Sequence, residues 1–275
     1  MKPEDNPTET LIPLQKHLFD LPSEITYLNC CYMSPQLLSV SEAGRQALFR
    51  KQQPWNITIP DFFEETENTR GLFAELIEAE PSDIAIIPAT SYGVAVAVKN
   101  LEVEPGSKIL MLYEQFPSNV LGWQELARLN EAQTVFLKDP HHSGWTDIIL
   151  QALDETTSLV ALPHVHWSDG RIIDLEAVAR RCREVQAALV LDLTQSAGAL
   201  PFSVQMVQPD FMIAATYKWL LGPYSMGFLY VHPKHQQGRP IEQNWINRKN
   251  SEDFAGLARY EHEFQQGARR FDVGE

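Results

Sequence analysis

Short apolar runs that alternate with longer amphipathic stretches constrain the fold of this chain more than any other feature of its sequence. Such runs are typical of buried parallel strands, and stretches whose apolar residues recur at helical spacing predict helices. The expected strands cover residues 84–88, 108–112, 134–137, 158–163, 188–192, 211–214 and 227–231. The expected helices cover residues 60–79, 91–100, 119–130, 146–155 and 175–186. This order predicts an α/β fold, in which helices flank a mostly parallel seven-stranded sheet.

Composition and charge disfavour several classes of partner. The chain has 275 residues, 44% of them hydrophobic, which is enough to build a large core. Its formal net charge of −14 repels the phosphates of nucleic acids and anionic lipids, so we expect neither a nucleic-acid nor a membrane partner. No apolar run approaches the ~18 residues of a membrane span, and the polar start is unlike a signal peptide. Cys30, Cys31 and Cys182 lack the spacing of a zinc site or of a disulfide framework, which favours a reducing cytoplasm.

The residues that follow the predicted strands are the first candidates for a functional site. In open parallel sheets, ligands bind outside the carboxyl ends of the strands. The residues at or just past these ends are Thr90, Phe116, His164, Asp192 and Lys218. We therefore expect the site to be built from this set.

Asp192 and Lys218 carry the clearest chemistry. Asp192 opens the segment DLTQSAG (192–198), where a desolvated carboxylate can pair with a cationic nitrogen, and capping a helix is the alternative role. Lys218 stands between Tyr217 and Trp219 in the segment ATYKWLLGP (215–223). A lysine in partly apolar surroundings has a lowered pKa and can attack a carbonyl group, and the alternative is a solvated loop lysine.

A possible phosphate site lies earlier in the chain. The segment PATSYG (88–93) connects a predicted strand to a predicted helix, and the free amide groups at a helix start bind phosphate well. Thr90 and Ser91 are the candidate ligands there. Threonine and serine are also common helix caps, which is the alternative explanation for both.

These motifs, in this order, resemble the class V aminotransferase family of fold-type I pyridoxal-phosphate (PLP) enzymes, which includes cysteine desulfurases, kynureninases and isopenicillin-N-epimerase-like proteins. The resemblance runs from about residue 27 to residue 275. It implies a PLP-binding large domain over residues 26–240, the major domain of fold type I, after an N-terminal arm of residues 1–25. Because the sequence ends without a cap, we expect residues 241–275 to be a linker and the start of a truncated C-terminal small domain.

The resemblance implies catalytic roles for two residues. Lys218 would carry PLP as a Schiff base and would then move the α-proton of the substrate. Asp192 would pair with the pyridine nitrogen and keep it protonated, so that the cofactor acts as an electron sink. Gln195 would lie near the ring hydroxyl.

The remaining cofactor contacts follow from the same resemblance. Thr90, Ser91, Thr216 and Tyr217 would bind the phosphate. Phe116, in the segment EQFPSN (114–119), would stack on the cofactor ring, and a core phenylalanine is the alternative. Most relatives carry histidine before the lysine, so Tyr217, together with Phe116, resembles the kynureninase or epimerase-like versions.

The segment PHVHWSDG (163–170) supports two hypotheses. It resembles a family segment that lines the cofactor and substrate pocket, which implies that His164 or His166 contacts the ring hydroxyl or the substrate. Two histidines at this spacing are also typical of metallo-hydrolase ligand motifs. The usual acidic ligand would fall at Ser168, and no later histidine cluster completes a site, so we expect no metal.

The leading hypothesis is a PLP-dependent transferase or lyase that acts on an amino acid or amine through a Lys218 aldimine, as a lyase, epimerase or transaminase. One alternative is a catalytically incomplete chain, which binds PLP but lacks the domain that holds the substrate carboxylate. A metallo-hydrolase that uses His164 and His166 is the other. The family resemblance also implies a homodimer.

Overall fold

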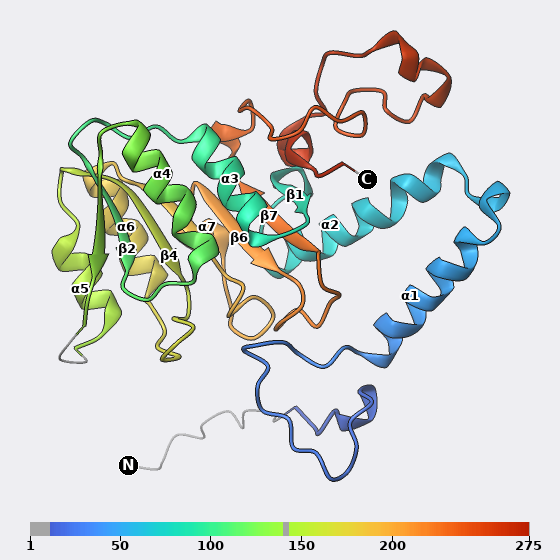
Figure 1. Ribbon diagram of the computed structural model, residues 1–275, viewed down its shortest axis with the longest axis horizontal. Helices are drawn as coiled ribbons and strands as arrows, with labels where there is room; N and C mark the ends of the chain where they lie inside the picture. Colours follow the sequence, from blue (N-terminus) through green and yellow to red (C-terminus); the bar gives the residue numbers. More distant parts are fainter. Residues whose placement is uncertain (1–11, 140–142, 275) are drawn as a thin grey trace, which may run out of the picture.

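The computed structural model describes residues 12–139 and 143–274, and its centre is one seven-stranded sheet (Figure 1). The strands are β1 (Ile84–Ile87), β2 (Lys108–Leu112), β3 (Gln133–Leu137), β4 (Thr157–Pro163), β5 (Ala188–Asp192), β6 (Phe211–Ala215) and β7 (Gly227–Val231). Their order across the sheet is β1-β7-β6-β5-β4-β2-β3. Only β7 runs against the others, because it pairs antiparallel with both β1 and β6 while the remaining pairs are parallel. The predicted sheet is therefore confirmed, as are its strands to within about two residues.

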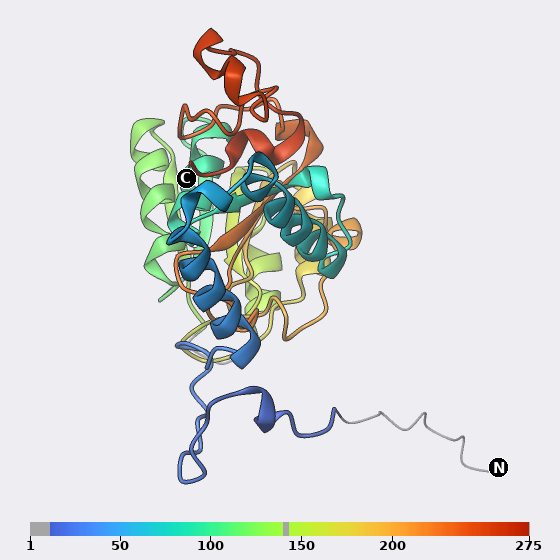
Figure 2. The same cartoon turned by 90° about the vertical axis from the view of Figure 1, so that its right-hand side faces the viewer.

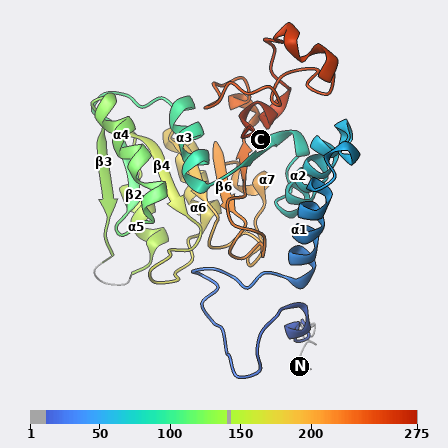
Figure 3. The same cartoon turned by 45° about the vertical axis from the view of Figure 1, so that its right-hand side comes forward.

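Helices cover both faces of the sheet (Figure 3). The covering helices are α2 (Glu64–Leu76), α3 (Thr90–Asn100), α4 (Leu121–Leu129), α5 (Trp145–Ala152), α6 (Leu175–Val185) and α7 (Val204–Val207), and they are preceded in the chain by α1 (Leu38–Lys51). Each face has its own core. One contains apolar residues of α3 and α4, and the other contains those of α2, α5, α6 and α7. Within β4, Leu159 and Ala161 join the first core and Val160 and Leu162 the second, as the two-residue period of a strand requires.

Helix α1 is an exception to this layered arrangement. The apolar spacing of residues 38–51 did not predict it, and none of its residues is buried. Figure 1 shows that α1 lies beside the body formed by the sheet and its covering helices, and Figure 2 shows the segment from residue 12 to α1 below that body. The predicted N-terminal arm, residues 1–25, is described only from residue 12 onward. No helix in the described part of the chain is both long and apolar enough to cross a membrane.

The C-terminal residues pack back on the first strand of the sheet. The structure has two short 3₁₀ helices in this region, Phe254–Arg259 and Gly267–Phe271. The first is short because Asp253 caps the amide of Gly256 and Tyr260 adopts a left-handed conformation that ends it.

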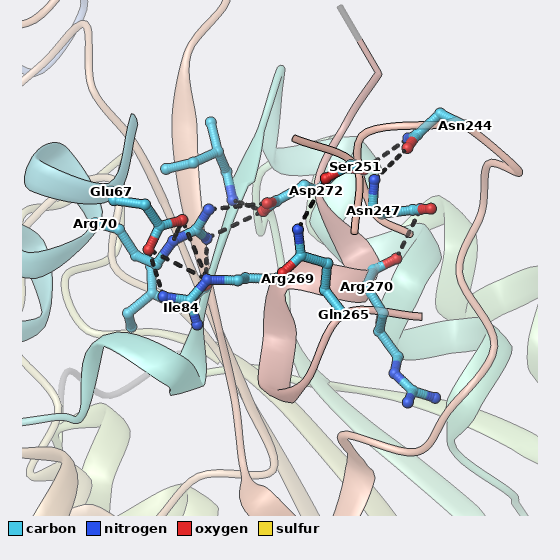
Figure 4. A network of polar contacts seen from close by, with 11 residues as sticks. Glu67, Arg70, Ile84, Asn244, Asn247, Ser251, Gln265, Arg269, Arg270 and Asp272 are labelled. Carbon is cyan, nitrogen blue, oxygen red and sulfur yellow. Dashed lines mark hydrogen bonds and ion pairs between the residues drawn. The ribbon is translucent and has the colours of Figure 1, made fainter. Parts of the chain in front are cut away.

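Ion pairs hold this segment in place (Figure 4). Arg70 on α2 is 1% exposed and donates to Asp272 at 2.8 Å, and Asp272 also accepts from the amide of Ile86 at 2.7 Å. Glu67 binds both Arg70 and Arg269. Residues 267–273 therefore contact the large domain directly. The domain boundary at residue 240 stays a prediction.

Candidate active site

A pocket lies at the carboxyl ends of the strands, where the sequence placed it. Its lining comes from the segments that follow β1, β2, β4, β5 and β6, which all end at the same edge of the sheet. The lining residues are Thr90, Gln115, Phe116, Asn119, Pro163, Val165, Trp167, Asp192, Thr194, Gln195, Tyr217 and Lys218. The structure thus brings together six of the predicted site residues, which are separated by up to 128 positions in the chain.

Lys218 is a buried lysine without a hydrogen-bond acceptor among the described residues. It follows β6 and is 7% exposed. Its Nζ lies 5.7 Å from the centroid of the Phe116 ring and 5.7 Å from that of Tyr217. Burial lowers the pKa of Lys218, although the charge of Asp192 opposes this shift. A larger share of the amine is therefore neutral at a given pH, and the neutral amine is the nucleophile.

Asp192 is the buried carboxylate of the site. It is the last residue of β5, it is 7% exposed, and it accepts a hydrogen bond from the amide of Thr194 at 2.9 Å. Burial raises the pKa of Asp192, and the amide of Thr194 and the charge of Lys218 oppose the shift. A carboxylate in this position gains most from a cationic partner in the pocket, because few water molecules reach it.

Thr194 links three strand ends. Its hydroxyl accepts from the amide of Ala215, the last residue of β6, at 3.1 Å. The same hydroxyl lies 3.3 Å from that of Thr90, at the start of α3. Thr194 therefore fixes Thr90 relative to the segment that carries Asp192.

The N-terminal segment that precedes α1 covers one side of the site. Gln195 donates to the carbonyl of Cys31 at 3.0 Å, and the amide of Ser34 donates to the carbonyl of Tyr217 at 3.1 Å. Gly198 allows the two site loops to approach each other. Its φ is +89°, and a Cβ there would lie 2.6 Å from the carbonyl oxygen of Trp219. Any side chain at Gly198 would push Trp219, and with it Lys218, out of place.

Phe116 and Asn119 supply a ring and a free donor. The Phe116 ring is 40% exposed and meets Trp167 edge to face, with centroids 5.7 Å apart. Asn119 is 1% exposed, and its Oδ1 accepts from the indole of Trp123 at 2.9 Å. Its buried Nδ2 has no partner in the described part of the chain. Because Trp123 fixes the amide, Nδ2 remains available to an oxygen acceptor in the pocket.

Four of the predicted residues do not reach the pocket lining. Ser91 is exposed on the first turn of α3. The hydroxyl of Thr216 is used by the backbone, since it donates toward the carbonyls of Pro223 and Met226 at 2.7 and 3.0 Å.

His164 and His166 are the other two. Pro163 and Val165 line the pocket, so the alternation of side chains turns His164 to a separate hollow beside Phe202. His166 is 1% exposed and binds the carbonyl of Tyr113. Burial lowers the pKa of both histidines.

Six lining residues were not singled out from the sequence, namely Gln115, Asn119, Pro163, Val165, Trp167 and Thr194. All six lie in segments that were recognised, within three residues of Phe116, His164 or Asp192. The sequence therefore predicted which segments line the pocket. It did not predict which side chains of those segments point into the pocket, because that direction depends on the loop conformation.

The chain belongs to the aminotransferase class-V family, whose model matches residues 59–264. It is 28% identical to an uncharacterized aminotransferase of Bacillus subtilis, YcbU, over 94% of this chain and 67% of that protein. It is 25% identical to a kynureninase of Geobacillus thermodenitrificans, over 82% of this chain and 57% of that enzyme. The chain therefore spans between about half and two thirds of the length of these relatives.

Solved structures share the fold. A cysteine desulfurase of Thermococcus onnurineus superposes with a TM-score of 0.81, at 19% identity, over 96% of this chain and 67% of its own. A mutant of C-DES, which has glycine covalently linked to its PLP cofactor, superposes with a TM-score of 0.82, at 21% identity, over 95% of this chain and 70% of its own. The fold-type I prediction is thereby confirmed, and family membership supports PLP as the cofactor.

The pocket residues fit this cofactor. The amine of Lys218, which has no acceptor among the described residues, suits a carbonyl group, and the buried carboxylate of Asp192 suits a cationic ring nitrogen. The half-exposed ring of Phe116 offers a stacking face, and the free Nδ2 of Asn119 offers a donor to an oxygen. Thr90 lies at the start of an eleven-residue helix, whose first amides bind a phosphate well.

Proposed function

We propose that this chain is a PLP-dependent enzyme that acts on an amino acid or an amine, with the cofactor attached covalently to Nζ of Lys218. The observation that carries the proposal is the buried Lys218 amine, which has no acceptor among the described residues and shares its pocket with the buried carboxylate of Asp192. A solvated loop lysine would not be 7% exposed with a lowered pKa. Family membership supports the same conclusion.

Each site residue has one task under this proposal. Bound in the pocket, PLP supplies an electron sink for the electron pair left on the substrate α-carbon. Nζ of Lys218 would take the α-proton of the substrate and return a proton, because burial lowers its pKa and a larger share of the amine is neutral. Asp192 holds a positive charge at the ring nitrogen. Phe116 covers one face of the ring, and Gln195 and Asn119 are close enough to line the same pocket.

The reaction we propose is of the lyase, epimerase or transaminase type. Phe116 and Tyr217 are the residues that favour the kynureninase or epimerase-like branch, because both replace histidines that are common in the family. Tyr217 lies 4.6 Å from Tyr224, ring centroid to ring centroid, on the side of the pocket that Lys218 occupies. The substrate class is an amino acid or an amine, as the names of the kynureninase and cysteine desulfurase relatives suggest.

The test is uptake of PLP by the purified chain. We expect a yellow protein whose visible band shifts on borohydride reduction, with the label recovered on the peptide that contains Lys218. Lys218→Ala is expected to lose the label completely, whereas Lys138→Ala, a lysine outside the pocket lining, keeps it. A colourless protein that ignores added PLP would refute the proposal. A screen of amino acids then tests turnover, and binding without turnover would favour a PLP-binding chain that is catalytically incomplete.

A homodimer is part of the proposal, and helix α1 supports it. None of the residues of α1 is buried, and the helix lies beside the body formed by the sheet and its covering helices. Leu48 and Phe49 on α1 are 72% and 63% exposed.

Sedimentation velocity tests the homodimer. The wild type is expected to sediment as a dimer, and Leu48→Glu combined with Phe49→Glu as a monomer. Leu129→Glu is the matched control, because Leu129 is also 64% exposed but lies on α4. A monomeric wild type would contradict the proposal. We also propose a reducing, cytoplasmic location, because Cys30, Cys31 and Cys182 are all free thiols.

No observation favours the metallo-hydrolase alternative. His164 and His166 line different parts of the structure, and His166 already contacts Tyr113 and Ser168. Within residues 12–139 and 143–274, no group of three or more histidine, cysteine or acidic side chains is arranged to hold a metal ion. We therefore do not carry this alternative further.

A further inference from the structure

Two consecutive residues of the segment after β4 bind two consecutive carbonyls of the segment after β2. Nε2 of His166 lies 3.1 Å from the carbonyl oxygen of Tyr113. The indole Nε1 of Trp167 donates to the carbonyl of Glu114 at 2.6 Å. Strands β4 and β2 are neighbours in the sheet, so these bonds join two loops at the same edge. We call the pair His166 and Trp167 the loop clamp.

The ring of His166 has one defined tautomer. A carbonyl oxygen only accepts hydrogen bonds, so Nε2 carries the proton and donates to Tyr113. Nδ1 then accepts from the hydroxyl of Ser168 at 3.0 Å. The ring is 1% exposed and packs 5.1 Å from the ring of Trp145. A buried neutral imidazole with both nitrogens engaged is a structural connector and has no atom left for the cofactor.

The loop that receives the clamp is strained at the residue that Trp167 binds. Glu114 has a φ of +59°, in the left-handed region that non-glycine residues avoid at a cost of roughly 1–2 kcal/mol. The bond from Trp167 to the Glu114 carbonyl offsets part of that cost. The sharp turn reverses the chain directly before Phe116, and it therefore decides where the Phe116 ring points.

Phe116 is held from two sides although its ring is not packed into the core. Its neighbour Gln115 donates to the carbonyl of Asn119 at 2.7 Å and accepts from the amide of Leu112 at 3.3 Å. On the other side, the edge of the Trp167 ring meets Phe116 at 86°. The ring nevertheless stays 40% exposed. Because the core does not enclose the Phe116 ring, its orientation is set by the hydrogen bonds of Gln115 and by the contact with Trp167.

We infer that His166 and Trp167 are positioning residues, which hold Phe116 at the angle at which its ring covers one face of the cofactor. The inference rests on the proposed function, because it concerns the same pocket. It also assigns His166 a task at a distance from the cofactor, in place of direct contact with the ring hydroxyl or the substrate. Trp167 has two tasks, which are to donate to Glu114 and to support the Phe116 ring.

Trp167→Phe separates these two tasks, because it removes the indole donor and keeps an aromatic ring. We expect PLP to bind roughly 3- to 10-fold more weakly, which corresponds to one net hydrogen bond. The circular dichroism of the visible PLP band is expected to fall, since it reports how firmly the cofactor is oriented, while borohydride still labels Lys218. Trp55→Phe is the matched control, because Trp55 is 77% exposed and lies outside the pocket lining.

A second pair of variants tests the other half of the clamp. His166→Gln keeps a donor near the position of Nε2, whereas His166→Leu has none. We expect His166→Gln to bind PLP within about twofold of the wild type and His166→Leu to weaken binding as Trp167→Phe does. This pair carries the test if Trp167→Phe fails to fold, which urea unfolding of the apoprotein detects.

The outcomes separate the clamp from the proposed function. If the wild type is labelled at Lys218 but folded Trp167→Phe and His166→Leu match it in affinity and dichroism, the clamp is refuted and the proposed function stands. If the wild type takes up no PLP, the proposed function is refuted and the clamp with it. Weaker binding and lower dichroism in both variants, with the controls unchanged, support the clamp.

Discussion

The strands that carry the candidate site and the helix that precedes them differ in how they are stabilised. Strands β4, β5 and β6 contain 17 residues, of which all but Ser158 and Ala188 are buried. Helix α1 contains 14 residues and buries none of them. Both regions have regular hydrogen bonding, so secondary structure alone does not distinguish them.

The two regions differ in burial, which supplies most of the stability of folded elements. The buried strands and the exposed helix α1 are therefore suited to different tasks. A site built on buried strand ends holds Asp192 and Lys218 in fixed geometry, whereas an uncovered helix is available to a partner. This difference would be contradicted by a substitution that lowers the free energy of unfolding only slightly in the strands or strongly in α1.

Phe211→Ala is expected to give the largest effect. Phe211 opens β6, is fully buried, and stacks on His235 with centroids 5.0 Å apart. Removing its ring leaves a cavity in the core, so we expect the free energy of unfolding to fall by about 3–5 kcal/mol. Urea unfolding measures the loss. A cost below about 1 kcal/mol would show that the core around β6 rearranges freely, and the contrast with α1 would then fail.

The strands could be predicted from the sequence because they are buried on both faces. A strand such as β5, which reads ALVLD, is apolar at successive positions, and no solvent-facing residue interrupts it. The positions of the site residues followed from the same signal, since Asp192 and Lys218 come directly after such runs. The carboxyl ends of parallel strands lie at the same edge of a sheet, so the residues that follow separate strands in the sequence could be predicted to lie close together in space.

The parts that could not be predicted depend on tertiary contacts. Helix α1 lacks an apolar stripe because it covers no core, so periodicity had nothing to detect. His164 and His166 stood in the right segment, but which way each side chain points is set by the loop between β4 and α6. Thr216 was expected to bind the phosphate, yet its hydroxyl satisfies two carbonyls of its own loop.

Asp210→Asn is expected to have the intermediate effect on the free energy of unfolding. It compares a buried charge that precedes β6 with an exposed charge on α1. Burial raises its pKa, but hydrogen bonds from His235, Lys234 and the amide of Leu189 outweigh this and lower the pKa to about 2. The pKa is depressed in the folded state, so the carboxylate stabilises the fold above its unfolded value of 3.8. That contribution, about 2 kcal/mol, is lost as the pH falls from about 4 through about 2.

Unfolding free energies of the wild type and Asp210→Asn, measured from pH 6 down to pH 2, test this prediction. We expect the difference between the two proteins to shrink by about 2 kcal/mol over the acid range. Glu42→Gln is the matched control on α1, where the exposed Glu42 pairs with Arg45, and no measurable change is expected. An unchanged difference between the wild type and Asp210→Asn would show that the ion pairs of Asp210 contribute no more than those of α1.

Phe49→Ala on α1 is expected to give the smallest effect and decides what α1 is for. Phe49 is 63% exposed, so truncation should change the unfolding free energy of the monomer by no more than about 0.5 kcal/mol. Urea unfolding at nanomolar protein, where a dimer dissociates, measures this cost directly. If the cost grows at micromolar protein, the ring gains its burial from a second copy of the chain, because only association depends on concentration. If the cost is as large at nanomolar protein as that of Phe211→Ala, α1 is packed on its own core, and the difference between the two regions disappears.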